Sequence, residues 1–165
     1  MTLNTPYGPA TYELDASGAL VSFMFGDASG RVDDGQSEIA RQVAEYFVGV
    51  RRKFDLALAP RGTAFQKRVW AELVSIPFGE TISYSELASR VGSPGAARAV
   101  GRANATNPIW LFIPCHRVIG TSGALTGYAG GLDLKEKLLR WEREVMAREN
   151  RIIPPPEDSL FADRV

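Results

Sequence analysis

Cys115 and His116 are the residues of this sequence best suited to chemistry, and they are its only cysteine and its only histidine. A thiolate is a strong nucleophile, and positive charge from His116 and Arg117 would favour the thiolate over the thiol. One cysteine excludes an internal disulfide, and the pair cannot supply the four ligands of a structural zinc site. The sequence therefore predicts a nucleophilic thiol and no metal site.

The surroundings of Cys115 limit how its thiol can be used. Residues 109–113 are strongly apolar, so a small buried core residue is the alternative interpretation of this cysteine. Neighbouring side chains in an extended segment point to opposite faces, so His116 can serve the sulfur only through a turn or a bridging water. The imidazole also needs a partner on its second nitrogen, and spacing leaves both Glu136 and Glu142 open.

The first third of the chain is patterned as strands followed by a helix. Residues 9–15 and 19–26 are rich in β-forming residues and flank a turn cluster, which predicts two strands. Apolar residues recur at helical spacing over 37–50. Residues 51–62 form a connector with a short extended piece, and we place the domain boundary there, with domains at 1–60 and 61–150 and a tail at 151–165.

Four helix starts follow this boundary. Capping patterns place them at Thr63 with Gln66, at Ser83 with Glu86, at Ser93 followed by Pro94, and at Asp133 with Glu136. The third helix is expected to run from Ser93 to about Thr106. The second and third are separated only by Gly92, which suits a helix-turn-helix that presents its second helix to DNA.

The third helix has unusually small side chains for a base-reading element. It offers Arg98, Arg102 and Asn104 among alanines and glycines, whereas direct readout uses several long polar side chains. Spacing alone therefore favours an ordinary packed helical hairpin and leaves DNA binding open.

Charge is unevenly distributed although the formal net charge is zero. Residues 61–142 hold ten basic and six acidic side chains, whereas 1–60 and 143–165 are mildly acidic. This asymmetry permits a polyanionic partner for the middle segment. No run approaches the roughly 20 apolar residues of a membrane helix, and no signal peptide is visible. We expect a cytoplasmic protein with no membrane partner.

Several motifs occur in unbroken order over about residues 62–142. They are FQxxVW at 65–70, IPxGxTxSY at 76–84, AARAVG at 96–101, NP at 107–108, IPCHRV at 113–118, GYxGG at 127–131, and the stretch 135–142. This set resembles the O6-alkylguanine-DNA alkyltransferases (methylated-DNA–protein-cysteine S-methyltransferases), in their bacterial form. Residues 1–60 resemble the first domain of that family only loosely.

The resemblance implies an α+β fold. A small N-terminal β-sheet with a helix, ribonuclease-H-like, would precede a mostly helical, winged helix-turn-helix-like domain. It also implies direct-reversal DNA repair with base flipping, in which the alkyl group of O6-alkylguanine, and of O4-alkylthymine, moves irreversibly to the protein. The partner would be double-stranded DNA that contains the lesion. No cofactor is needed, because the lesion itself donates the alkyl group.

The resemblance also assigns roles at the reacting centre. Cys115 would accept the alkyl group, and His116 would act through a water as its base. Glu142 would orient the imidazole. Tyr84 would contact the flipped nucleotide and help proton transfer to the leaving guanine, and Asn107 would hold the turn before the cysteine.

Further roles concern DNA and the guanine pocket. Arg98 would enter the duplex and fill the space of the extruded base, and Ala97, Arg102 and Ser93 would complete the DNA-binding surface. The pocket would include Val118, Tyr128, Ala129 and Gly130. Some family members have Asn and Ser where this chain has Gly127 and Ala129, so the Ser hydroxyl is lost here.

The single thiol also predicts a single use. An S-alkyl thioether has no easy leaving path, and the sequence has no second thiol to resolve it. We expect a monomer and leave open whether neighbouring molecules cooperate on DNA. Two other classes remain to be tested, a DNA-binding module without chemistry and a thiol hydrolase with multiple turnovers.

Overall fold

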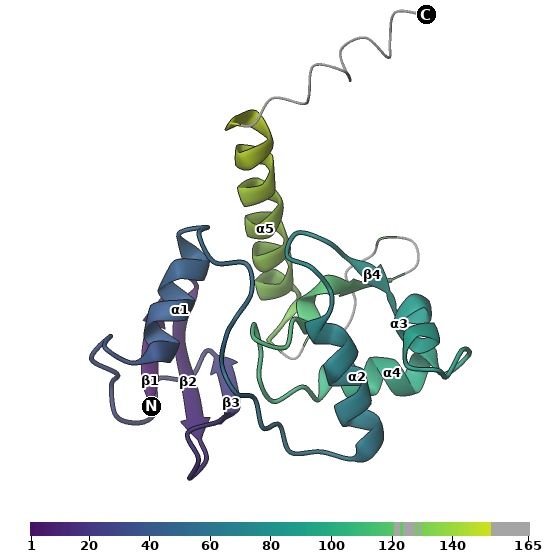
Figure 1. Ribbon diagram of the computed structural model, residues 1–165, viewed down its shortest axis with the longest axis horizontal. Helices are drawn as coiled ribbons and strands as arrows, with labels where there is room; N and C mark the ends of the chain where they lie inside the picture. The colour runs from purple at the N-terminus through teal and green to yellow at the C-terminus, as the bar shows by residue number, and fades with distance from the viewer. Residues whose placement is uncertain (121–122, 124–127, 129, 153–165) are drawn as a thin grey trace, which may run out of the picture.

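The computed structural model describes residues 1–120, 123, 128 and 130–152. Figure 1 shows the sheet and α1 on one side, helices α2 to α4 on the other, and α5 rising between them. The sequence prediction of a tail covers 151–165; α5 ends at Ile152, and residues 153–165 lie outside the described residues. The division at residue 60 stays a prediction.

The N-terminal sheet has three antiparallel strands in the order β1-β2-β3. They are β1 (Thr2–Thr5), β2 (Gly8–Leu14) and β3 (Leu20–Phe25). The two predicted strands correspond to β2 and β3. Sequence reasoning missed β1, because four residues with three polar side chains carry no recognisable alternation, yet Thr2 and Leu3 are buried.

Helix α1 (Glu38–Phe47) follows the sheet. Ser37 accepts a hydrogen bond from the Ala40 amide and so caps the helix. The predicted range ran to residue 50, but the helix ends at Phe47 and Gly49 takes a left-handed φ of 83°. The connector then returns beside β3, where the Leu20 amide donates to the carbonyl of Ala57. The predicted short extended piece in this connector is thus confirmed.

The remaining helices begin close to the predicted signals. Thr63 and Gln66 form a reciprocal capping box at α2 (Ala64–Val74). Ser83 caps α3 (Tyr84–Arg90) by accepting a hydrogen bond from the Glu86 amide. Helix α5 (Leu132–Ile152) begins one residue before Asp133. Asp133 therefore lies within its first turn and is not its cap.

The predicted start of the third C-terminal helix is wrong. Helix α4 (Ala97–Ala105) begins four residues after Ser93 and has no side-chain cap. Ser93 instead opens a turn in which its carbonyl accepts a hydrogen bond from the Ala96 amide. Gly95, with a φ of 88°, prevents a helix from starting at Pro94.

The apolar segment before the cysteine is a buried loop that contacts the N-terminal sheet. The Phe23 amide donates to the carbonyl of Pro108, and the Trp110 amide donates back to Phe23. Leu111 takes a left-handed φ of 72° while buried, which is unusual for a bulky residue. The loop leads into a 3-10 turn, η1 (Cys115–Arg117), and into β5 (Val118–Ile119).

A short parallel pair joins this segment to the helix-turn-helix. Strand β4 (Ile82–Ser83) pairs with β5, with Ile82 opposite Val118. The pairing places the start of α3 next to the residues after the cysteine. Buried apolar residues from Leu3 to Val145 form one cluster across the whole molecule. Among the described residues, no helix is long and apolar enough to cross a membrane.

Candidate active site

Cys115 lies in a turn whose backbone is hydrogen-bonded by the side chains of two asparagines. Asn107 accepts a hydrogen bond from the Ile109 amide at 2.9 Å and donates to the carbonyl of Ile113 at 2.8 Å. Asn104 donates to the carbonyl of Cys115 itself at 3.3 Å. All of these groups are buried, so the amides satisfy loop atoms that water does not reach. The geometry supports the expectation that Asn107 holds this turn.

His116 pairs with Glu142 rather than Glu136. Its Nε2 atom lies 2.7 Å from Oε1 of Glu142, and both side chains are buried. Glu136 is exposed on α5. The choice that spacing left open is therefore decided by the packing of α5 against η1. Nδ1 of His116 is buried and has no hydrogen-bond partner among the described residues.

The carboxylate of Glu142 accepts hydrogen bonds from three other parts of the chain, the first of which is the turn that holds His116 and Arg117. Arg117 donates from Nη2 to Oε1 at 2.9 Å and from Nε to Oε2 at 3.0 Å. The Gly79 amide donates to Oε2 at 3.1 Å, and the Tyr46 hydroxyl donates to Oε1 at 2.8 Å. Burial alone would raise the pKa of Glu142, but His116 and then Arg117 outweigh it and hold that pKa well below its usual range.

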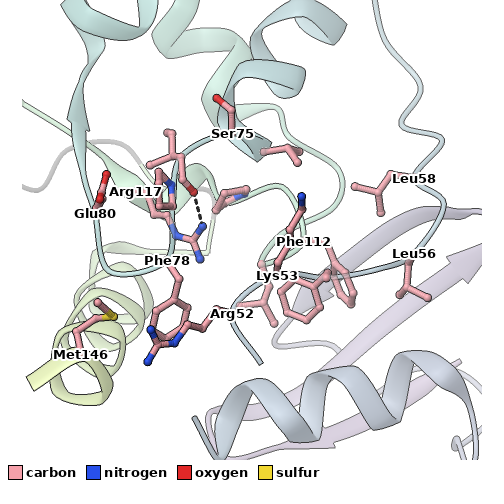
Figure 2. Close-up of a pocket in the computed structure, with 16 residues that line it drawn as sticks. Arg52, Lys53, Leu56, Leu58, Ser75, Phe78, Glu80, Phe112, Arg117 and Met146 are labelled. Atoms are coloured by element: carbon pink, nitrogen blue, oxygen red, sulfur yellow. Dashed lines mark hydrogen bonds between the residues drawn. The ribbon is translucent and has the colours of Figure 1, made fainter. Parts of the chain in front are cut away.

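Arg117 has a role that the sequence did not predict. We expected its charge to favour the Cys115 thiolate, but the guanidinium instead clamps Glu142 and donates to the carbonyl of Ile76 at 2.7 Å. Figure 2 shows this bond and the ring of Phe78, which lies 5.7 Å from the guanidinium carbons of both Arg117 and Arg52. The residues that line a cavity of about 570 Å³ include Arg52, Ile76, Phe78 and Arg117.

The thiol of Cys115 is protonated in the resting protein. Burial raises its pKa to about 11, although interactions with Asn107, Lys135 and Tyr128 lower it. Burial likewise lowers the pKa of His116, against the opposing effect of Glu142, so the imidazole is neutral at pH 7. The site therefore holds a neutral thiol beside a neutral base.

Lys135 is a buried cation in this site, and sequence reasoning missed it. Its side chain is fully buried, and burial lowers its pKa to about 8 while the nearby Cys115 raises it. Its ammonium lies 5.8 Å from the ring centroid of Tyr84. A lysine at a core-facing position of an amphipathic helix is a sequence signal that could have found it.

Tyr84 lies at the start of α3, directly after its cap Ser83, as predicted. Its ring packs over α4, where a Cβ atom on Gly101 would lie 3.8 Å from the ring. The small residues of α4 therefore let Tyr84 lie close to this helix. They have a packing role inside the protein as well as any role toward DNA.

Of the predicted pocket residues that the structure describes, Tyr128 and Gly130 lie close together. Val118 is buried in β5, and the ring of Tyr128 lies 5.9 Å from that of Trp110. A Cβ atom on Gly130 would lie 3.0 Å from the Tyr128 ring and 2.8 Å from the Leu134 side chain, so a larger residue there would force these side chains to shift. Ala129 lies outside the described residues.

The predicted DNA-binding residues lie on α4 and in the turn before it. Arg98 and Arg102 are exposed on α4, and Ala97 is its first residue. Asn104, which the sequence offered as a third polar residue of this face, is buried and faces Cys115. Ser93 lies in the turn before the helix and does not cap it.

Tyr46 and Gly79 are the other site residues that sequence reasoning missed. Gly79 has a φ of 81°, and a Cβ atom there would lie 2.6 Å from Met146. Its place in the motif at 76–84 was a usable signal. Tyr46 had none, because it contacts Glu142 across 96 positions of the chain. Among the described residues, no group of three His, Cys, Asp or Glu side chains could hold a metal ion.

Comparison with known proteins extends this picture to most of the chain. Residues 64–144 match the family model of the 6-O-methylguanine DNA methyltransferase DNA binding domain. A methylated-DNA–protein-cysteine methyltransferase of Methanosarcina acetivorans is 49% identical over 146 residues, which are 84% of this chain and 94% of the relative.

Two solved structures from Mycobacterium tuberculosis share the fold. OGT in complex with DNA has a TM-score of 0.80 and 46% identity, over 87% of this chain and 92% of that one. The O6-methylguanine methyltransferase has a TM-score of 0.79 and 42% identity, over 97% and 96%. Fold and site thus define a protein that repairs O6-methylguanine in DNA by methyl transfer to a cysteine. The chain belongs to the methylated-DNA–protein-cysteine methyltransferase family. The expected α+β class and reaction are confirmed.

Proposed function

We propose that Cys115 is the methyl acceptor and that the substrate is O6-alkylguanine, and also O4-alkylthymine, in double-stranded DNA. One observation carries this assignment: the only thiol of the chain lies in a turn with His116, whose imidazole is held by the buried carboxylate of Glu142. A histidine held in this way is a suitable general base for a cysteine nucleophile.

The chemistry follows from the protonation states of these groups. Nε2–H of His116 donates to the ionised Glu142, so Nδ1 carries the lone pair that can take the thiol proton, through a bridging water. The sulfur then forms a bond to the alkyl carbon as the bond from that carbon to O6 breaks. The guanine leaves with the electron pair of that bond and takes a proton from the Tyr84 hydroxyl. The products are S-alkylcysteine and an unmodified guanine.

Burial of the thiol requires the damaged base to leave the helix. Cys115 is 1% exposed, so its sulfur cannot reach O6 inside a stacked duplex. We assign Arg98 to the space of the extruded base, because it is exposed on α4. Arg102 would contact backbone phosphates, and Ala97 and Ser93 would lie against the duplex.

Val118, Tyr128 and Gly130, together with Ala129, would enclose the flipped base. Burial raises the pKa of the Tyr128 hydroxyl well above its ordinary value, and the nearby Cys115 raises it further. This hydroxyl has no hydrogen-bond partner among the described residues. The tyrosine therefore remains a neutral hydrogen-bond donor. Without the Ser hydroxyl at position 129, the pocket relies on backbone groups for the guanine oxygen.

Transfer would occur once per molecule and would need no cofactor. The thioether has no easy leaving path, and the chain has no second cysteine to resolve it. We further propose that the protein acts as a cytoplasmic monomer.

Intact mass spectrometry tests the assignment. Incubation with duplex DNA that carries O6-methylguanine should add one methyl group per molecule, located on Cys115, and a second addition of DNA should change nothing. Cys115→Ser should bind the same DNA with no gain in mass. Absence of the methyl adduct in the wild-type protein would favour a DNA-binding module without chemistry. Turnover of an ester or peptide would favour a hydrolase.

A further inference from the structure

We propose that Tyr46, in the N-terminal part of the chain, is a positioning residue for methyl transfer. Its hydroxyl donates to Oε1 of Glu142 at 2.8 Å, and Nε2 of His116 lies 2.7 Å from that same oxygen. Tyr46 therefore helps to set how Glu142 presents this oxygen to the imidazole. It lies outside the segment that matches the family model, which begins at residue 64. The inference rests on the roles assigned above to Cys115 and His116.

Packing fixes where the Tyr46 hydroxyl lies. The side chain is fully buried. Its ring lies edge-on to Phe78, with 5.7 Å between centroids, and stacks on Phe54 at the same separation. Phe47 contacts it edge-on at 5.0 Å. With aromatic rings on several sides, the phenol has little freedom to follow a moving carboxylate, so it holds Glu142 in place.

The backbone of Tyr46 is tied to the same helix. Trp141, the residue before Glu142, donates from its indole nitrogen to the carbonyl of Tyr46 at 3.2 Å. Both ends of Tyr46 thus bond to adjacent residues of α5. This double attachment sets the position of α1 along α5 at the point where the carboxylate lies.

Tyr46 also affects the charge that His116 faces. Burial raises the pKa of the Tyr46 hydroxyl well above its ordinary value, and the charge of Glu142 raises it further. The phenol therefore remains a donor throughout the working pH range. A donor on Oε1 draws charge from the oxygen that stabilises the imidazolium formed during transfer. Arg117 on the same carboxylate and Lys135 nearby act on His116 in the same direction.

Tyr46→Phe in the full chain is the direct test, because it removes the hydroxyl and retains the ring. We expect the rate of methyl transfer at saturating DNA to fall about tenfold, because the loss of a fixed carboxylate position outweighs the higher basicity that His116 gains. Affinity for the DNA should not change. A wild-type rate for this variant would overturn the proposal.

The single histidine provides a readout that a purely structural role would not move. In protein labelled with [15N]histidine, NMR reports His116 alone. Tyr46→Phe should shift the Nε2–H resonance and raise the pKa of His116, because Oε1 keeps more of its charge. An unchanged His116 titration, even with a lower stability, would overturn the proposal.

Tyr7→Phe is the matched control. Tyr7 also lies in the N-terminal part, packs edge-on to Phe47, and donates its hydroxyl to α5, at the carbonyl of Lys137. Its loss should leave both the rate and the His116 titration unchanged. Equal losses in the two variants would show a general packing effect and overturn the specific role of Tyr46.

A double-mutant cycle completes the test. Once Glu142 is replaced in Glu142→Gln, adding Tyr46→Phe should lower the rate by less than it does in the wild type. Additive losses would overturn the proposal. Failure of the wild-type protein to methylate Cys115 would instead overturn the proposed function, so the two failures are distinguishable.

Discussion

Nε2 of His116 lies 2.7 Å from Oε1 of Glu142, and this contact determines which nitrogen of the imidazole can act as a base. Because Glu142 is ionised, Nε2 carries the proton and Nδ1 carries the lone pair. Glu142, 26 positions from His116 in the chain, therefore determines which ring nitrogen of His116 is free to accept a proton.

Glu142→Gln should lower the rate of methyl transfer about 100-fold, because an amide stabilises the imidazolium less and can present its NH2 group to Nε2. It should also lower the free energy of unfolding by about 3 kcal/mol, because the buried Arg117 loses its counter-charge. Rapid-quench assays with labelled DNA measure the rate, and chemical denaturation measures the free energy of unfolding. Glu136→Gln, on the exposed face of the same helix, is the control. A larger loss there would contradict the assignment of Glu142.

The rate of transfer should depend on pH through His116. Burial lowers the pKa of this group, so the imidazole is neutral and able to accept a proton at pH 7. The rate should be level just above pH 6.5 and should fall as the pH drops through the pKa of His116, since the protonated ring cannot accept the thiol proton. Single-turnover rates between pH 5 and 8 measure this. A midpoint above 6.5 would be inconsistent with the burial argument.

Arg98→Ala should slow repair of duplex DNA by at least about tenfold while affecting a single-stranded lesion much less, because only the duplex must be held with a base extruded. Arg102→Ala on the same helix serves as the comparison. It should weaken binding to both substrates alike and reduce the salt dependence of binding by about one ion. Equal loss on both substrates for Arg98→Ala would remove its role in base flipping.

Lys135→Met should remove part of the pH dependence of the stability of the protein. Burial lowers the pKa of Lys135 to about 8 in the folded chain, against an ordinary value of 10.5. Between these values the unfolded chain binds more protons, so wild-type stability rises with pH over that interval and carries the full cost of the buried charge below pH 8. The variant lacks this ionisable group, so its free energy of unfolding relative to that of the wild type should fall by about 2 kcal/mol as the pH rises from 8 to 10.5.

Denaturation of Lys135→Met at several pH values measures this difference. Methyl transfer by the same variant should slow, because the charge of Lys135 lowers the pKa of the Cys115 thiol. A difference in stability between the two proteins that stays the same from pH 7 to pH 10.5 would contradict the lowered pKa of Lys135.

Local features of this fold were predictable because they act within a few residues. Thr63 and Ser83 cap helices that begin at the next residue, and the β-forming residues over 9–15 correspond to a strand. The start predicted at Ser93 failed for a local reason too, since Gly95 takes a left-handed conformation that the capping pattern does not encode.

The sequence by itself determined that Cys115 is the only thiol, that His116 is the only imidazole beside it, and that the surrounding motifs resemble a family of alkyl acceptors. Tertiary structure alone decided that the Tyr46 hydroxyl bonds to the carboxylate of Glu142 and that Arg117 binds Glu142 rather than serving the thiol. The reason is physical: a buried polar group must find a partner wherever packing brings one, and that partner can lie 96 residues away.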